Sequence, residues 1–141
     1  MEVLSLCLIA STALTTGLLF HQAAAAFYET RRTTREDSPE EDISRLVPRH
    51  PDSDEQPFLD NAYQTMLENT WEWHDVVAVE ELFFMDLAPG LAPVIGIIDL
   101  VLRKDCSYVV VDHKTSKRFG DPDPDQLALY AEHVKRSRDA T

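Results

Sequence analysis

Apolar residues recur at helical spacing in the first half of the chain. The segment Ser11–Thr30 predicts a helix, because apolar positions three and four residues apart fall on one face. We expect that face to carry Leu14, Leu18, His21, Ala25 and Tyr28. Gly17 lies one turn before His21, where a glycine weakens a helix but lets another backbone come close. A second helix is predicted over Phe58–Thr70, with Leu59, Tyr63, Met66 and Leu67 on its apolar face.

The pattern changes to that of strands in the second half. Val76–Leu87 is rich in β-branched and aromatic residues, which favour strands, and Pro89-Gly90 marks a turn. Val94–Leu102 is nearly continuous valine, isoleucine and leucine around one aspartate, which is typical of a buried strand. Tyr108–Asp112 predicts a third strand. A last helix is predicted from Asp125 onward, with Leu127, Tyr130 and Val134 facing the core.

Residues 31–57 separate the first two predicted helices. They are polar, acidic and rich in proline, so we interpret them as a flexible acidic insert with a short helix near Glu40–Leu46. The whole length of 141 residues corresponds to one domain. We therefore expect residues 1–141 to form a single domain that contains this insert.

The charge of the chain disfavours one class of function. The formal net charge is −12, whereas proteins that bind nucleic acid normally present a basic surface to the phosphates. The acidic residues gather between Glu36 and Asp86, while the stretch Arg103–Arg138 is slightly basic. A bound cation would offset some of the carboxylates. The charge therefore counts against DNA binding without excluding it.

The two cysteines and the N-terminal segment indicate where the protein works. Cys7 and Cys106 form no CxxC pair, so we expect no zinc or iron–sulfur site from this chain and a cytoplasmic location. The apolar N-terminal segment ends in four alanines, as a signal peptide can, but it carries Glu2 and no lysine or arginine. Its polar residues also argue against a membrane span. A secreted protein cleaved after Ala26, and so lacking His21, stays an alternative.

Counting residues along one predicted hairpin places two aspartates opposite each other. Suppose that the strands on either side of Asp105-Cys106 pair through a symmetric tight turn. Asp99 then lies directly opposite Asp112 on the same face, with Cβ atoms roughly 4.5–5.5 Å apart. Lys114, two residues after Asp112, shares that face. A slip of one residue would point the two aspartates to opposite faces.

Two facing aspartates on buried strands require a positive partner. Like charges opposed across strands destabilise a sheet, and an unpaired buried carboxylate is costly. Lys114 is one candidate for this partner and a divalent cation is the other; oxygen ligands suit Mg²⁺ or Mn²⁺. Such an arrangement suits metal-assisted hydrolysis of phosphodiesters, in which a lysine orients the attacking water. Glu80 and Glu81 precede the hairpin, and we expect them to be solvated.

Four short motifs, in order, resemble those of the PD-(D/E)XK nucleases, and especially of the RecB-like exonucleases with their CRISPR-associated members. The segments Gly96–Asp99 and Asp112–Thr115 are similar to the core of that family. Gln126–Tyr130 resembles its QxxxY motif, and Gly17–His21 resembles its N-terminal helix motif, in which a histidine joins the metal site. The resemblance covers most of the chain.

The resemblance implies both a fold and a set of roles. The fold is α/β, with a restriction-endonuclease-like core in which helices flank a small central mixed sheet. The activity is a Mg²⁺- or Mn²⁺-dependent DNA exonuclease in DNA repair, recombination or phage and CRISPR DNA processing. Asp99 and Asp112 would ligate the metal with His21 and the backbone carbonyl of His113, and Lys114 would be catalytic. Gln126 and Tyr130 would support the site or contact DNA.

The chain also departs from that family. The CRISPR-associated members carry four cysteines for an iron–sulfur cluster, three of them after the QxxxY helix. This chain ends soon after Tyr130, so we expect a cluster-free member or a fragment of a longer protein. Three simpler interpretations stay open: a surface ion pair of Asp112 with Lys114, a core histidine at position 21, and ordinary helix packing by Gln126 and Tyr130. An inactive nuclease-like binding module is a further alternative. Cleavage polarity, strand preference and oligomeric state are not predicted.

Overall fold

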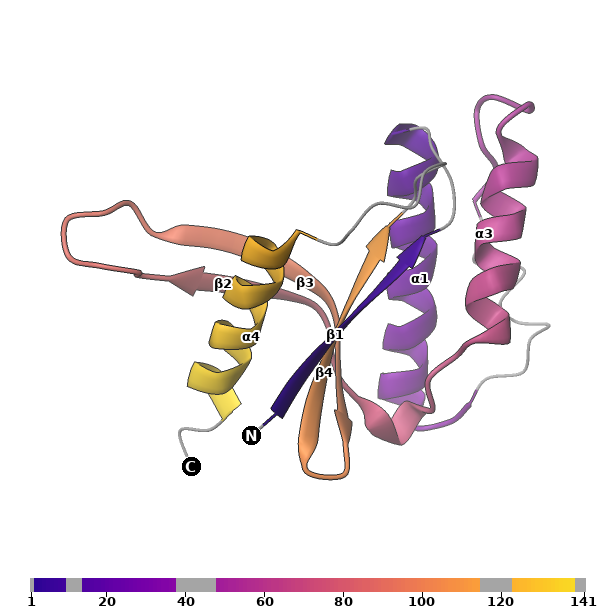
Figure 1. Ribbon diagram of the computed structural model, residues 1–141. Coiled ribbons are helices and arrows are strands. Elements are labelled where there is room, and N and C mark those ends of the chain that lie inside the picture. The colour runs from indigo at the N-terminus through magenta and orange to yellow at the C-terminus, as the bar shows by residue number, and fades with distance from the viewer. Residues whose placement is uncertain (1, 10–13, 38–47, 115–122, 139–141) are drawn as a thin grey trace.

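The protein is a mixed four-stranded sheet with helices on both faces (Figure 1). The computed structural model describes residues 2–9, 14–37, 48–114 and 123–138, with side chains from residue 15 onward. The elements are β1 (Glu2–Ile9), α1 (Leu14–Thr34), α3 (Gln56–Glu68), the short 3₁₀ helix η1 (Trp73–Asp75), β2 (Val76–Met85), β3 (Val94–Lys104), β4 (Ser107–Lys114) and α4 (Pro124–Arg138). The strand order is β1-β4-β3-β2. Strand β3 is antiparallel to both of its neighbours, and β1 is parallel to β4.

Strand β1 is the element that the sequence pattern misses. It pairs with β4 from Glu2↔Ser107 to Ile9↔Lys114. Its sequence, EVLSLCLI, is a short apolar run, and such runs do not distinguish a strand from a buried helix. The segment that superficially resembles a signal peptide is therefore part of the sheet and of α1.

Alternate residues of the central strands β3 and β4 pack into two separate hydrophobic cores, one on each face of the sheet. On one face Leu100, Leu102, Val109 and Val111 pack with residues of α1 and α3; on the other, Val101 and Val110 pack with Tyr130 and Val134 of α4. This alternation is what a strand covered on both sides requires. Figure 1 shows α1 and α3 on one side of the sheet and α4 on the other.

Helix α1 extends beyond the predicted Ser11–Thr30 segment and ends at Thr34. Arg35 follows with a left-handed backbone (φ 57°) and donates its N–H to the Arg31 carbonyl, which closes the last turn. The predicted apolar face is only partly correct, because Leu18 is 59% exposed. The buried face is Phe20, Ala23, Ala24, Phe27 and Tyr28. No helix within the described ranges is both long and apolar enough to cross a bilayer.

Helix α3 begins two residues before the predicted start. Pro57 lies in its first turn, where the missing N–H of proline is harmless. Leu59, Tyr63 and Met66 are buried against α1, as predicted, and Leu67 is partly buried. The short helix expected near Glu40–Leu46 lies outside the described residues.

The β2–β3 hairpin extends from the sheet as an arm (Figure 1). Gly90 has φ 83°, as the predicted Pro89-Gly90 turn needs. The arm also corrects a prediction, because the first half of β3 is not buried: Ile95 and Ile97 are 65% and 52% exposed. Only the second half of β3, from Ile98 to Leu102, supplies buried apolar residues.

Candidate active site

The candidate site lies where β3 and β4 stop pairing. The register of the hairpin is the predicted one, from Lys104↔Ser107 to Leu100↔Val111. The next pair would be Asp99 with Asp112, but the ladder ends before it. Asp99 Oδ2 instead accepts a hydrogen bond from the backbone N–H of His113, at 2.7 Å. Figure 1 shows β3 leaving β4 toward the arm. The Asp99 carboxylate thus lies in the fork between the two strands.

Helix α1 supplies the histidine of the site. His21 Nδ1 lies 2.7 Å from the carbonyl oxygen of Gly17, one turn earlier, and its Nε2 lies 3.4 Å from Asp99 Oδ2. If Nδ1 donates to the carbonyl, Nε2 faces the carboxylate. That contact, opposed by burial, raises the pKa of His21 to about 9. A ring fixed through Nδ1 to a backbone carbonyl is also the usual arrangement of a histidine that binds metal through Nε2.

The two aspartates have different electrostatic surroundings. Burial would raise the pKa of Asp99, but the bond with His21 and the nearby charge of that ring outweigh it and lower the pKa. Burial raises the pKa of Asp112, the Asp99 carboxylate adds to the rise, and Lys114 opposes it. Asp112 is only 5% exposed. The pair therefore concentrates negative charge where little water can screen it.

Lys114 connects the strand pair with α4. Its Nζ lies 2.8 Å from Asp112 Oδ2 and 3.4 Å from Gln126 Oε1. The Gln126 amide in turn donates to the Tyr130 hydroxyl, at 2.7 Å. Gln126 and Tyr130 lie four residues apart and so share one face of α4. The structure thus brings Gln126 and Tyr130 to the lysine.

The side chain of His113 is buried in the core beside the site. It is 4% exposed, stacks on Tyr28 with ring centroids 6.5 Å apart, and meets Phe20 edge-on at 5.7 Å. Burial lowers its pKa to about 4, so the ring is neutral near pH 7. The backbone of His113 reaches the site, because its N–H donates to Asp99 and its contact with His21 helps to raise the pKa of that residue. The His113 ring also meets the His21 ring edge-on, with centroids 6.0 Å apart. The His113 carbonyl as a metal ligand stays a prediction.

The donor set fits a divalent cation. Asp112 Oδ2 is buried and accepts no hydrogen bond of ordinary geometry from the described residues; its near neighbour is the Lys114 ammonium. Two adjacent carboxylates and an imidazole nitrogen are ligands that Mg²⁺, and still better Mn²⁺, accepts. Without a cation, the protonated His21 and the Lys114 ammonium balance the two carboxylates. A bound cation would take over part of that balance, because His21 must lose its proton before Nε2 can bind a metal.

In the described part of the chain, one group of three residues with ligand atoms close together lies outside the candidate site and was not predicted from the sequence, whereas the side chains of His21, Asp99 and Asp112 do not form such a group. Glu72, His74 and Asp75 offer ligand atoms within 4.8 Å of one another. His74 Nε2 lies 3.0 Å from Glu72 Oε2, and Lys104 Nζ lies 3.0 Å from Asp75 Oδ2. The group is mostly exposed and lies at the start of β2. Its signal in the sequence is the Glu72-x-His74-Asp75 spacing, and the Lys104 ammonium already pairs with Asp75.

The prediction that Glu81 is solvated is wrong. Its carboxylate pairs with Arg138 and with His133 Nε2, the latter at 3.0 Å, and its side chain is 20% exposed. These contacts join β2 to α4. Glu80, by contrast, is exposed as expected.

Comparison with known families agrees with this geometry. A family model described as the PD-(D/E)XK nuclease superfamily matches residues 5–141. The expected α/β fold, with a small mixed sheet flanked by helices, is the fold observed. No curated protein and no solved structure matches the chain.

Proposed function

Since the chain belongs to the PD-(D/E)XK nuclease superfamily, we propose that it is a DNA exonuclease of the RecB-like type that uses Mg²⁺ or Mn²⁺. DNA repair, recombination and phage or CRISPR DNA processing are the settings that suit it. Members of this superfamily are metal-dependent nucleases. The finer assignment is supported by one observation: Lys114 lies between Asp112 and a glutamine–tyrosine pair, while His21 approaches Asp99 from the other side.

The geometry supports a role for each side chain in this proposal. Asp99, Asp112 and His21 would hold the ion, with the His113 carbonyl as the predicted further ligand. When bound, the ion supplies Lewis acidity and a water of lowered pKa. The Lys114 ammonium, held by Asp112 and Gln126, would orient the attacking water and offset charge that develops on the phosphate. Tyr130 fixes Gln126 and so positions the lysine.

The test is digestion of end-labelled linear single- and double-stranded DNA with Mg²⁺, with Mn²⁺ and with EDTA. We expect metal-dependent release from the ends and a loss of about a hundredfold to a thousandfold in Lys114→Ala. Lys135→Ala is the matched control, because Lys135 is an exposed lysine on α4. The labelled end on which products appear gives the polarity of cleavage.

The net charge of −12 favours a second candidate, a nuclease-like module that binds a partner without cleaving DNA. Folded protein that degrades neither substrate with either ion would overturn the proposed exonuclease and favour this module. Cleavage that Lys114→Ala leaves unchanged would show that the catalytic centre lies elsewhere.

A further inference from the structure

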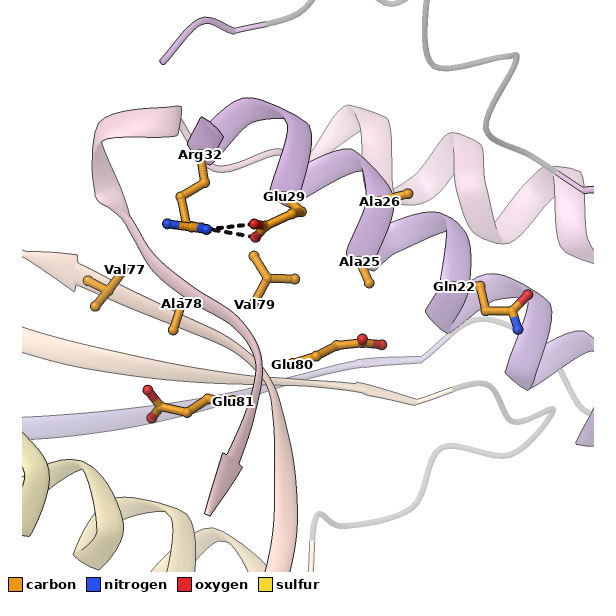
Figure 2. A pocket seen from close by; sticks show the side chains of 10 residues that line it. All are labelled: Gln22, Ala25, Ala26, Glu29, Arg32, Val77, Ala78, Val79, Glu80 and Glu81. Atoms are coloured by element: carbon orange, nitrogen blue, oxygen red, sulfur yellow. Dashed lines mark hydrogen bonds and ion pairs between the residues drawn. The ribbon is translucent and has the colours of Figure 1, made fainter. Parts of the chain in front are cut away.

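A cavity adjoins the candidate site between α1 and β2. Its volume is ≈740 Å³, which is in the range of small-molecule and cofactor sites. Figure 2 shows Gln22 and Glu80 toward one end and the ion pair of Glu29 with Arg32 at the other. Ten residues of helix separate Gln22 from Arg32, so the cavity follows α1 for roughly 15 Å.

The end of the cavity at Gln22 and Glu80 lies beside the proposed catalytic centre, because each of these residues is a neighbour of a site residue. Gln22 directly follows His21. Glu80 lies across the β2–β3 ladder from Asp99, between the pairs Val79↔Leu100 and Glu81↔Ile98. A strand that leaves the proposed metal site along α1 would therefore place its next nucleoside here.

Glu80 is the chemically distinctive residue of this cavity. Within the described ranges its carboxylate has no hydrogen-bond or ion-pair partner. Its backbone is left-handed, with φ 49°, which is uncommon for a residue other than glycine. In Figure 2 its side chain lies under α1 on the side of Gln22. The carboxylate is thus exposed to any group that enters the cavity.

The character of the walls indicates a base and not a phosphate. The Glu80 carboxylate would repel a phosphate, and the Arg32 guanidinium is already paired with Glu29. Ala25, Ala78 and Val79 offer an apolar surface to the face of a ring. A carboxylate accepts N–H groups and donates none. Among the bases, guanine presents two adjacent N–H groups on its pairing edge, which match the two carboxylate oxygens. That edge is free only in an unpaired nucleotide.

We infer that the cavity between α1 and β2 is the subsite for an unpaired nucleoside next to the scissile phosphate, with Glu80 selecting guanine by its pairing edge. The inference rests on the proposed function, which it deepens by naming the form of DNA end that is preferred.

The experiment uses single-stranded oligonucleotides of one sequence that carry guanine, hypoxanthine or thymine at the three positions of each end. Hypoxanthine differs from guanine only by the missing amino group. We expect kcat/KM for guanine to exceed that for hypoxanthine by about tenfold, chiefly through KM. Glu80→Gln and Glu80→Gly should both abolish this preference, and Glu68→Gln, on the exposed end of α3, should keep it. Mn²⁺ binding measured by calorimetry should be the same in all four proteins.

Four outcomes would overturn the inference. An active protein without a guanine preference refutes the subsite and leaves the proposed function intact, and so does a preference that survives Glu80→Gln. If Glu80→Gln stops cleavage of all three substrates and binds less Mn²⁺, Glu80 is a metal ligand. A wild-type protein that cleaves none of the substrates overturns the proposed function itself, and this inference with it.

Discussion

At the scale of single residues, the backbone and the side chain of His113 have different roles. Its N–H holds the Asp99 carboxylate in the strand fork, while its ring lies in the core between Tyr28 and Phe20. The ring nitrogen Nδ1 is buried and has no hydrogen-bond partner among the described residues. The side chain therefore contributes a polar atom to an apolar core without any evident task at the site.

This separation can be tested with His113→Phe. We expect the metal-free protein to gain about 1 kcal/mol in the free energy of unfolding, because an unpaired buried nitrogen is replaced by an apolar ring. Cleavage should persist, since the backbone N–H is unchanged. Urea denaturation and the DNA digestion assay measure the two effects. Loss of cleavage in a stably folded variant would show that the imidazole itself takes part.

The site residues were accessible from the sequence to different degrees. Counting outward from Asp105-Cys106 predicted that Asp99, Asp112 and Lys114 lie close together on one face, because a hairpin with a tight turn has a fixed register. The break in the ladder at Asp99 could not be foreseen. It coincides with the contact of Asp99 with His21 of α1, across 78 positions of the chain. Periodicity carries no information on such contacts.

At the scale of elements, Gly96 shows why the motif before Asp99 contains a glycine. It pairs with Phe83 on β2, and a Cβ atom at position 96 would lie 2.6 Å from two atoms of the Phe83 ring. That ring is packed against Tyr130 and His133 of α4, with centroids 5.6 and 5.1 Å away. The glycine thus makes room for the ring on which α4 sits.

Gly96→Ala should therefore disturb the docking of α4. We expect a loss of about 1–3 kcal/mol in the free energy of unfolding, because the Phe83 ring must move. Cleavage should fall as well, since Gln126 on α4 would no longer be held beside Lys114. Combining Gly96→Ala with Phe83→Leu should cost less than the sum of the two single changes. Additive losses in a double-mutant cycle would contradict the steric explanation.

The elements themselves were predicted unevenly. Strands rich in β-branched residues, such as β3 and β4, were predicted at nearly their observed bounds. The buried face of α1 was misplaced, because apolar residues such as Leu18 occur around the whole helix and the pattern does not single out one stripe. Strand β1 was missed because its pairing with β4 is decided by tertiary contact.

At the scale of the whole molecule, Glu81 fastens the C-terminal helix to the sheet. Burial would raise its pKa, but Arg138 and His133 outweigh that effect and lower it. A carboxyl whose pKa is lower in the folded state contributes stability above its unfolded pKa of about 4.5. That contribution is lost as the pH falls through the folded value. Falling pH also reduces self-repulsion from the net charge of −12, which acts in the opposite direction.

Comparison with Glu81→Gln at each pH isolates the contribution of this carboxylate. We expect the wild type to be more stable by about 2 kcal/mol at pH 7. The difference should be constant down to about pH 5 and shrink below pH 4.5. Denaturation at pH 7, 5 and 3.5 measures it. A difference that is the same at all three pH values would mean that the ion pair does not stabilise the fold.

The parallel pairing of β1 with β4 has a consequence for how the protein is made. Glu2 pairs with Ser107, 105 positions further along the chain. Ribosomes add roughly 5–20 residues per second, so the apolar strand EVLSLCLI waits roughly 5–20 s for its partner. During that wait its backbone can pair with other chains. The step that completes the sheet is thus the one most exposed to misassembly on the ribosome, and conditions that shorten the wait or keep chaperones abundant should raise the yield of native protein.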